Sequence, residues 1–336
     1  MKQRLLWVIL LISLVLLLMR NLFDDVVSPL ETEVRIQTRQ VAAKIFATQN
    51  DVMPPTHSRA NEPTKPIEPA AVVCAAERHD PDAIQYVEEL LQELSDELTP
   101  YHGQLSNLAA LELYLPTELE EHMPRIKSLL TQSYSEYRNA FALSARRRFT
   151  VNMVFAPNYA TSFDDLASRL GVDPRGSQGF YLGDSNTVLV ENNSVHQALT
   201  TAVHEAIHVY NYRLVGVLPR WLNEGLAEYF EMLASIKLAG KGQVLSDKTQ
   251  PLEFSVMLSS EAQWETQSRD QLYFSARVWS QFLMTHVQGR NALKAILHAE
   301  AQTPCTTLTA EHIQALMENH FPLYEQAFFN WWQALL

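Results

Sequence analysis

The pentapeptide HEAIH at residues 204–208 constrains the fold more than any other part of the sequence. It lies in a segment that reads as a helix, which Ser194 can cap at its start. Side chains four residues apart leave one face of a helix one turn apart, so His204 and His208 can reach a common point. Glu205 is rotated by about 100° around the helix from His204. Its carboxylate can therefore lie beside that point without being a ligand there. Two neutral imidazole nitrogens in this arrangement suit a divalent ion such as Zn²⁺.

A second helix supplies a third candidate ligand, Glu224. This helix is expected to begin near Pro219 and to end around Gly240. The connection through Gly216 is short enough to fold it back beside the first helix. Two histidines and one glutamate, with a fourth position left for water, form the ligand set of a hydrolytic zinc site. Glu228 lies one turn beyond Glu224, where it could accept the outer N–H of a ligating histidine.

The two motifs together, HEAIH at 204–208 and PRWLNEGLAEYFE at 219–231, resemble those of the gluzincin zinc metallopeptidases. That group includes thermolysin and aminopeptidase N. The sequence looks most like the peptidase MA-like family of bacterial proteins. The looser pattern of this resemblance covers roughly residues 109–335.

The resemblance implies a zinc ion bound by His204, His208 and Glu224. It implies that Glu205 is the catalytic residue that acts as general base and proton shuttle. It also implies that residues 187–190 form the edge strand of a sheet, along which an extended peptide would pair.

Two further features bear on the kind of peptidase. Tyr273 opens a downstream helix at a place comparable to that of the tyrosine with which gluzincin aminopeptidases bind the oxyanion, so it is a second candidate catalytic residue. Upstream of residues 204–208 there is no segment like the GAMEN motif that holds a free amino terminus in those enzymes. An endopeptidase is therefore favoured over an aminopeptidase.

The pattern of apolar residues predicts a small sheet followed by helices. Strands are expected at 111–115, 149–155, 179–182 and 187–190, and helices at 80–98, 119–141 and 162–170. From Ser194 onward nearly every segment reads as helical. This order favours an α+β fold. With the resemblance, the expected architecture is zincin-like: a small mixed sheet packed on the active-site helix, followed by an all-helical lobe.

The amino terminus carries an uncharged apolar run at residues 5–19. Extended through Phe23 it gives about 19 residues, or roughly 28 Å as a helix, which just spans a hydrocarbon core. Lys2 and Arg4 precede the run, and a positive end stays in the cytoplasm. We therefore expect a transmembrane signal anchor at 5–23, with the rest of the chain exported to the periplasm. A cleaved signal peptide is the alternative.

The predicted organisation follows from these segments. It comprises a cytoplasmic tip at 1–4, the anchor at 5–23, a Pro-rich stalk at 24–73, an N-terminal helical segment at 74–108, a zincin-like catalytic core at 109–240 and a helical carboxy-terminal lobe at 241–336. In an exported protein Cys74 and Cys305 could form one disulfide bond, and the sequence leaves open whether they pair.

The expected function is zinc-dependent hydrolysis of peptide bonds by a metal-activated water, carried out by a single-pass protein of the inner membrane. Its partners would be a peptide or protein substrate and, through the N-terminal helix, the membrane. A net charge of −12 without a basic stripe argues against nucleic acid. Two alternatives stay open. One is a zinc-binding pseudoenzyme or peptide-binding scaffold of the cell envelope, and the other is a metal-free structural module.

Overall fold

The part of the chain that the structure describes leaves out the amino terminus. The computed structural model describes residues 80–159, 162–174, 176–240, 249–264 and 269–335. These residues belong to one compact unit, Glu68–Leu336. The expected tip, anchor and stalk, together with Cys74, lie outside the described residues.

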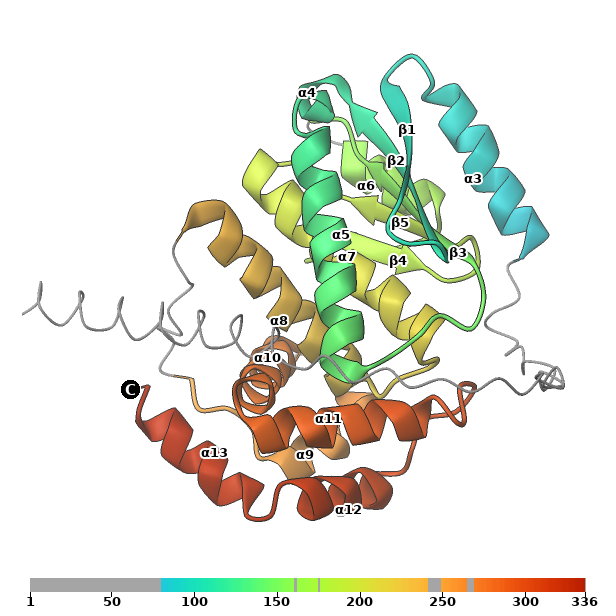
Figure 1. Ribbon diagram of the computed structural model, residues 1–336. Helices are drawn as coiled ribbons and strands as arrows, with labels where there is room; N and C mark the ends of the chain where they lie inside the picture. Colours follow the sequence, from blue (N-terminus) through green and yellow to red (C-terminus); the bar gives the residue numbers. More distant parts are fainter. Residues whose placement is uncertain (1–79, 160–161, 175, 241–248, 265–268, 336) are drawn as a thin grey trace, which may run out of the picture. The chain divides into compact units, whose positions relative to one another are not determined.

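One mixed sheet of five strands runs through the described residues (Figure 1). The strands are β1 (Leu98–Gln104), β2 (Ala109–Pro116), β3 (Phe149–Phe155), β4 (Gly179–Leu182) and β5 (Thr187–Val190). Their order in the sheet is β1-β2-β3-β5-β4. The strands β2, β3 and β5 are parallel, and β1 and β4 pair antiparallel at the two edges. The expected α+β class with a small mixed sheet is confirmed.

The edge strand beside the helices is β4, so the expectation that residues 187–190 form the edge is wrong. Strand β5 pairs with β3 on one side, where Val154 lies opposite Leu189. On its other side it pairs with β4, where Tyr181 lies opposite Val188. Because β3 already occupies one side of β5, the hairpin can add β4 only to the remaining open side.

The two faces of the sheet are covered by different helices. Alternate side chains of a strand point to opposite faces. In β3, Met153 packs into the larger apolar cluster with helices α5 and α7, whereas Val154 faces a smaller cluster with α3 and α6. In β5, Val188 belongs to the larger cluster and Leu189 to the smaller one. The larger cluster continues into the C-terminal helices, so the core joins the sheet to that part of the chain.

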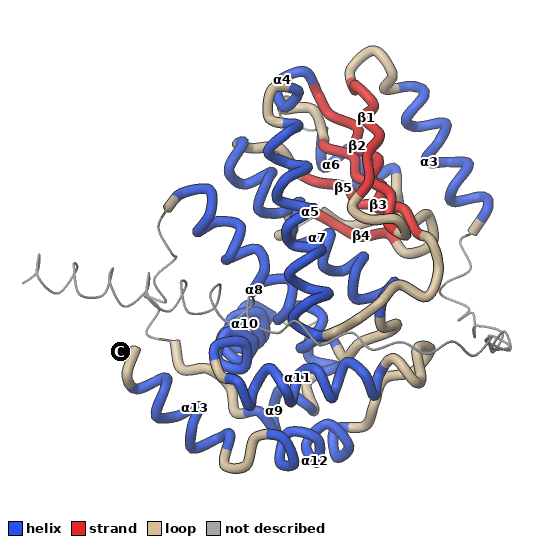
Figure 2. The backbone as a smooth tube through the Cα atoms, viewed as in Figure 1, coloured by secondary structure: helices blue, strands red, loops and turns tan. Residues whose placement is uncertain are grey.

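Some helices lie beside the sheet, and the carboxy-terminal part of the described chain consists of further helices (Figure 2). They are α3 (Pro81–Glu93), α4 (Thr117–Glu120), α5 (Met123–Phe141), α6 (Ser162–Arg169), α7 (Val195–Leu214), α8 (Arg220–Ala239), α9 (Phe254–Leu258), the 3₁₀ turn Glu261–Gln263, α10 (Arg269–Thr285), α11 (Val287–Glu300), α12 (Ala310–His320) and α13 (Tyr324–Gln333).

Two expected helices differ from the structure. The helix expected at 80–98 stops at Glu93, and the chain then enters strand β1, which the sequence did not predict. The long helix expected at 119–141 is broken at Glu121 and His122 into α4 and α5. Pro124 lies in the first turn of α5, a position that proline tolerates although it cannot continue a preceding helix.

Helices α7 and α8 are joined by a tight connection. Ser194 caps α7, and its side chain accepts the backbone N–H of Gln197 at 3.2 Å. Gly216 in the connection has a φ of +130°, which favours glycine, and a Cβ there would collide with Pro304. Val217 N–H donates to Pro304 O at 2.9 Å. A loop far along the chain therefore holds the connection in place.

The loop that contains Pro304 is itself held at two points. Glu300, fully buried at the end of α11, accepts the Leu308 N–H with both carboxylate oxygens, at 3.1 and 3.0 Å. Cys305 is disulfide-bonded, and no cysteine in the described residues is free. The chain's other cysteine, Cys74, lies outside those residues.

Helix α8 packs very closely against α10. A Cβ on Gly225 would collide with Ser280 Oγ and would lie 2.7 Å from Ala276 O. The absence of a side chain at Gly225 lets the two backbones approach. Because Gly225 follows Glu224 directly, this contact fixes the turn of α8 that carries the third candidate ligand.

The structure corrects the expectations about the membrane. Within the part of the chain that it describes, no helix is long and apolar enough to cross a bilayer. The expected anchor at 5–23 lies outside that part. We therefore correct three expectations: a transmembrane signal anchor, the membrane as a partner, and a single-pass inner-membrane protein with an exported periplasmic body.

Candidate metal centre

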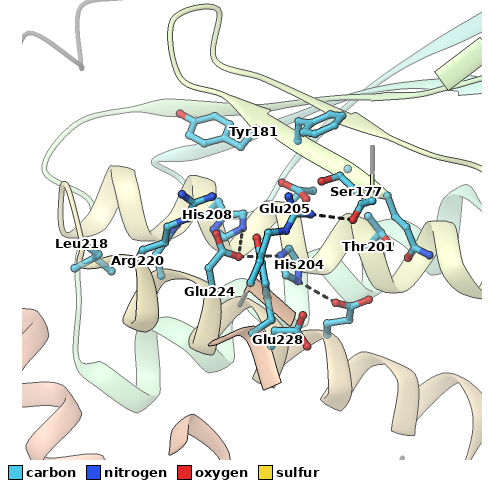
Figure 3. Close-up of a pocket in the computed structure, with 18 of the residues that line it drawn as sticks. Ser177, Tyr181, Thr201, His204, Glu205, His208, Leu218, Arg220, Glu224 and Glu228 are labelled. Carbon is cyan, nitrogen blue, oxygen red and sulfur yellow. Dashed lines mark hydrogen bonds and ion pairs between the residues drawn. The ribbon is translucent and has the colours of Figure 1, made fainter. Parts of the chain in front are cut away.

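Helices α7 and α8 lie side by side and run in opposite directions. Asn211 and His208 on α7 contact Asn223 and Glu224 on α8, whereas His204, one turn earlier on α7, also reaches Glu231 further along α8. The short connection expected from the sequence therefore does fold α8 back along α7. Figure 3 shows His204, His208 and Glu224 pointing toward one another from the two helices.

Three atoms of these side chains converge. Glu224 Oε2 lies 3.6 Å from His204 Nε2 and 3.6 Å from His208 Nε2. Such a separation is too long for a hydrogen bond. Ligand atoms of a tetrahedral zinc ion, each about 2.0–2.1 Å from the metal, are about 3.3–3.4 Å apart. The three atoms are therefore spaced to share a cation, and this donor set fits a metal.

A second group overlaps the first. His204, Glu228 and Glu231 also lie close enough to hold a metal ion between them. In the structure, however, the outer nitrogen of His204 has a partner, because Nδ1 lies 2.9 Å from Glu231 Oε2. This hydrogen bond leaves Nε2 of His204 facing Glu224. The first group is thus the better candidate for the metal centre.

Glu228 was expected to accept a hydrogen bond from the outer nitrogen of a ligating histidine. In the structure Glu231 makes this contact, with Nδ1 of His204. Both residues lie on the same face of α8 as Glu224. Glu228 lines the cavity next to the centre, and burial raises the pKa of its carboxyl. Glu231 is the site residue that sequence reasoning missed. Its spacing of seven residues from Glu224 was a signal that could have identified it.

A proton on His204 offsets part of the negative charge of the Glu224 and Glu231 carboxylates. Burial acts against a charged His204, but the carboxylates of Glu224 and Glu231 outweigh it and hold the pKa of His204 well above its usual value. Burial lowers the pKa of His208. Burial also disfavours the Glu224 carboxylate, yet the two histidines lower its pKa. A divalent cation would replace the proton on His204, so cation binding must depend on pH.

Glu205 lies between the centre and the edge strand. It is 5% exposed, and burial, the main cause, raises its pKa to about 8. A Cβ on Gly179 of β4 would lie 2.9 Å from Glu205 Oε1 and 2.8 Å from Thr201 Cγ2. The strand therefore lies directly over the carboxylate. A carboxyl with a raised pKa beside a metal position is suited to accepting and releasing a proton near neutral pH.

A cavity of about 1080 Å³ opens onto the centre. It is lined by the two histidines, by Glu205 and by residues of two walls. One wall is the segment 176–182, which includes β4, and the other is the first half of α10, with Arg269 and Tyr273. Arg269 joins the walls, because its guanidinium donates to Gly176 O at 3.1 Å.

Tyr273 lines this cavity, as its expected role requires. Its ring packs edge-on against Trp264, with the ring centroids 5.1 Å apart. Burial, with a smaller effect from the Glu224 carboxylate, raises the pKa of its hydroxyl to about 12. Tyr273 is therefore neutral at physiological pH and can donate a hydrogen bond into the cavity.

Comparisons with known proteins add little to this geometry. No family model matches the chain, and no curated protein matches it. Among solved structures, that of aminopeptidase A from Legionella pneumophila in complex with aspartic acid is weakly similar, with 14% identity and a TM-score of 0.43. The match covers 70% of this chain and 27% of that one, so the chain spans about a quarter of that protein's length. The resemblance to gluzincins and to the peptidase MA-like family stays a prediction.

Proposed function

We propose that the chain is a zinc-dependent peptidase of the gluzincin type with a zincin-like fold. His204, His208 and Glu224 would be the metal ligands, Glu205 the general base and Tyr273 an oxyanion donor. The observation that carries this proposal is the convergence of His204 Nε2, His208 Nε2 and Glu224 Oε2, each histidine nitrogen 3.6 Å from the carboxylate oxygen. Nitrogen and carboxylate ligands with an open fourth position suit hydrolytic zinc.

The residues around the metal position support hydrolysis. When bound, zinc lowers the pKa of water and polarises a carbonyl oxygen. Glu205 takes a proton from the attacking water and delivers it to the leaving amine. Its burial favours the protonated form that the second step needs. Tyr273 donates its hydroxyl proton in a hydrogen bond to the developing oxyanion.

The edge strand supports a peptide as the substrate. Strand β4 lines the cavity and lies at the edge of the sheet, where, within the described residues, β5 is the strand that pairs with it. An extended peptide could pair with that edge and lie across the metal position. We favour an endopeptidase, since the chain has no segment resembling the motif that holds a free amino terminus in the related aminopeptidases.

The test combines zinc stoichiometry with peptide cleavage. The full-length chain should bind one zinc ion and cleave members of a mixed peptide library, and a chelator should abolish cleavage. Glu205→Gln should keep the zinc and lose at least about 100-fold in rate, because a general base contributes 10²–10⁴-fold. Glu136→Gln is the matched control, because Glu136 lies on α5 outside the cavity, paired with Lys237.

Each result decides between the candidates. Zinc binding without any cleavage would favour the pseudoenzyme or peptide-binding scaffold. A chain that binds no zinc would exclude both zinc-dependent functions. Undiminished cleavage by Glu205→Gln would remove Glu205 from the mechanism, even if the zinc site were correct.

A further inference from the structure

A row of buried polar side chains leads from helix α5 to the metal centre. Tyr137 on α5 and Asn211 on α7 are 0% and 1% exposed. The Tyr137 hydroxyl donates to Asn211 Oδ1 at 2.6 Å. Asn211 Nδ2 donates to Asn223 Oδ1 on α8 at 2.8 Å. The row therefore crosses all three helices and ends at the residue that precedes the ligand Glu224.

The direction of these hydrogen bonds is fixed. Asn211 Nδ2 also lies 3.5 Å from the backbone carbonyl oxygen of Asn223, which can only accept. The amide of Asn211 must therefore turn its NH₂ group toward Asn223 and its oxygen toward Tyr137. Burial raises the pKa of the Tyr137 hydroxyl far above its usual value, so this hydroxyl keeps its proton and donates.

Asn223 in turn lies beside the ligand His208. Its side-chain oxygen accepts one hydrogen bond from Asn211 and has a second lone pair. The Nδ1 atom of His208 is buried and makes no well-formed hydrogen bond with a described residue. The Asn223 side chain nonetheless lies beside the His208 ring. A histidine that binds a metal through Nε2 must carry its proton on Nδ1 and needs an acceptor there.

We propose that Tyr137, acting through Asn211 and Asn223, is a positioning residue that holds His208 with its proton on Nδ1 and its Nε2 free for the metal. The inference rests on the metal centre of the proposed function. Tyr137 touches neither the metal position nor the cavity. Its hydroxyl anchors the far end of the row, and without it Asn211 Oδ1 would be buried without a donor and could turn away.

The key variant is Tyr137→Phe, which removes one hydroxyl and keeps the ring. Direct partners of a ligating histidine change metal affinity about 10–100-fold. For this more distant residue we expect zinc affinity to fall about 3–10-fold, measured by competition with a chromophoric chelator at fixed pH. Asn211→Leu, which breaks the row nearer the centre, should lower it about 10–100-fold.

The matched control is Tyr134→Phe. Tyr134 lies on the same helix, is 2% exposed, and packs against Tyr210 as Tyr137 does, but its hydroxyl contacts Ser106. This variant should change zinc affinity less than about twofold. The Nδ1–H proton resonance of His208 in the zinc-loaded protein gives a second measurement. It should shift or broaden in Tyr137→Phe and stay unchanged in Tyr134→Phe.

The outcomes separate this inference from the proposed function. If the unaltered chain binds no zinc, the metal centre itself is wrong. If it binds zinc and the two tyrosine variants weaken binding equally, Tyr137 contributes only to packing and the positioning role is refuted. The same conclusion follows if Tyr137→Phe lowers the melting temperature but leaves both zinc affinity and the His208 resonance unchanged.

Discussion

The candidate ligands and the walls of the cavity around them are assembled in different ways. The ligands come from α7 and α8, which follow one another in the chain and meet through a tight connection. The walls come from residues 176–182 and from α10, which are far apart in sequence and are joined by a hydrogen bond from Arg269 to Gly176 O. The candidate ligands are therefore encoded locally, whereas the shape of the cavity depends on distant segments.

Removal of a ligand should have the largest effect. For Glu224→Ala we expect zinc affinity to fall by more than about 100-fold, beyond the 10–100-fold typical of residues that support a ligand. Glu231→Ala should lie within that range, and Glu228→Ala below it. Competition with a chelator measures all three. If Glu228→Ala and Glu231→Ala cost more than Glu224→Ala, the overlapping group of His204, Glu228 and Glu231 holds the ion instead.

A change in the α10 wall should leave the metal in place. We expect Tyr273→Phe to lower kcat about 100-fold with little change in KM or zinc content, because the lost hydrogen bond forms mainly in the transition state. Tyr229→Phe is the control, because Tyr229 lies on α8 outside the cavity. A loss of zinc in Tyr273→Phe would mean that metal binding depends on the α10 wall as well as on the ligands.

The contact between α8 and α10 can be tested through stability. Alanine is favoured over glycine in a helix by about 1 kcal/mol. At Gly225, however, a Cβ would collide with Ser280 Oγ, and overpacking costs about 1–3 kcal/mol. Because the cost outweighs the gain, we expect Gly225→Ala to lower the free energy of unfolding by up to about 2 kcal/mol. Gly183→Ala, at a position with open space around it, should be close to neutral in the same denaturant titration.

The smallest expected effect concerns the loop that holds the α7–α8 connection. Burial raises the pKa of Glu300 to about 7. In the unfolded chain it is near 4.3, so between these values the folded state binds more protons and stability falls as pH rises. Glu300→Gln removes this titration. Relative to the unaltered chain, the variant should gain unfolding free energy as pH rises from 5 to 8. A constant difference across that range would contradict the assignment.

The sequence predicted which side chains would meet because their spacing has few geometric solutions. On neighbouring helices, His204, His208 and Glu224 can face a common point, and the structure brings them together. Four of the five strands were predicted because alternating or continuous apolar residues mark them. Strand β1 was missed because Pro100 and Gly103 are unusual in strands and most of its residues are exposed.

Other features depended on packing that local patterns do not encode. Glu228 and Glu231 share a face of α8, and only the way that α8 lies along α7 decides which of them meets His204. The edge strand was expected at residues 187–190, which form β5. Because β5 pairs in parallel with β3, the edge of the sheet is β4 instead. The row from Tyr137 to Asn223 joins residues far apart in the chain, each of which reads alone as an ordinary buried polar group.

The hydrogen bond between Val217 and Pro304 has a consequence for biosynthesis. A ribosome releases His204, His208 and Glu224 well before Pro304. Until the loop that contains Pro304 has been synthesised, the connection between α7 and α8 lacks the hydrogen bond from Val217. The two helices can then pack together in a register other than the final one. We therefore expect stable metal uptake only after Pro304 has been synthesised, and a nascent chain that stalls before Pro304 should load poorly.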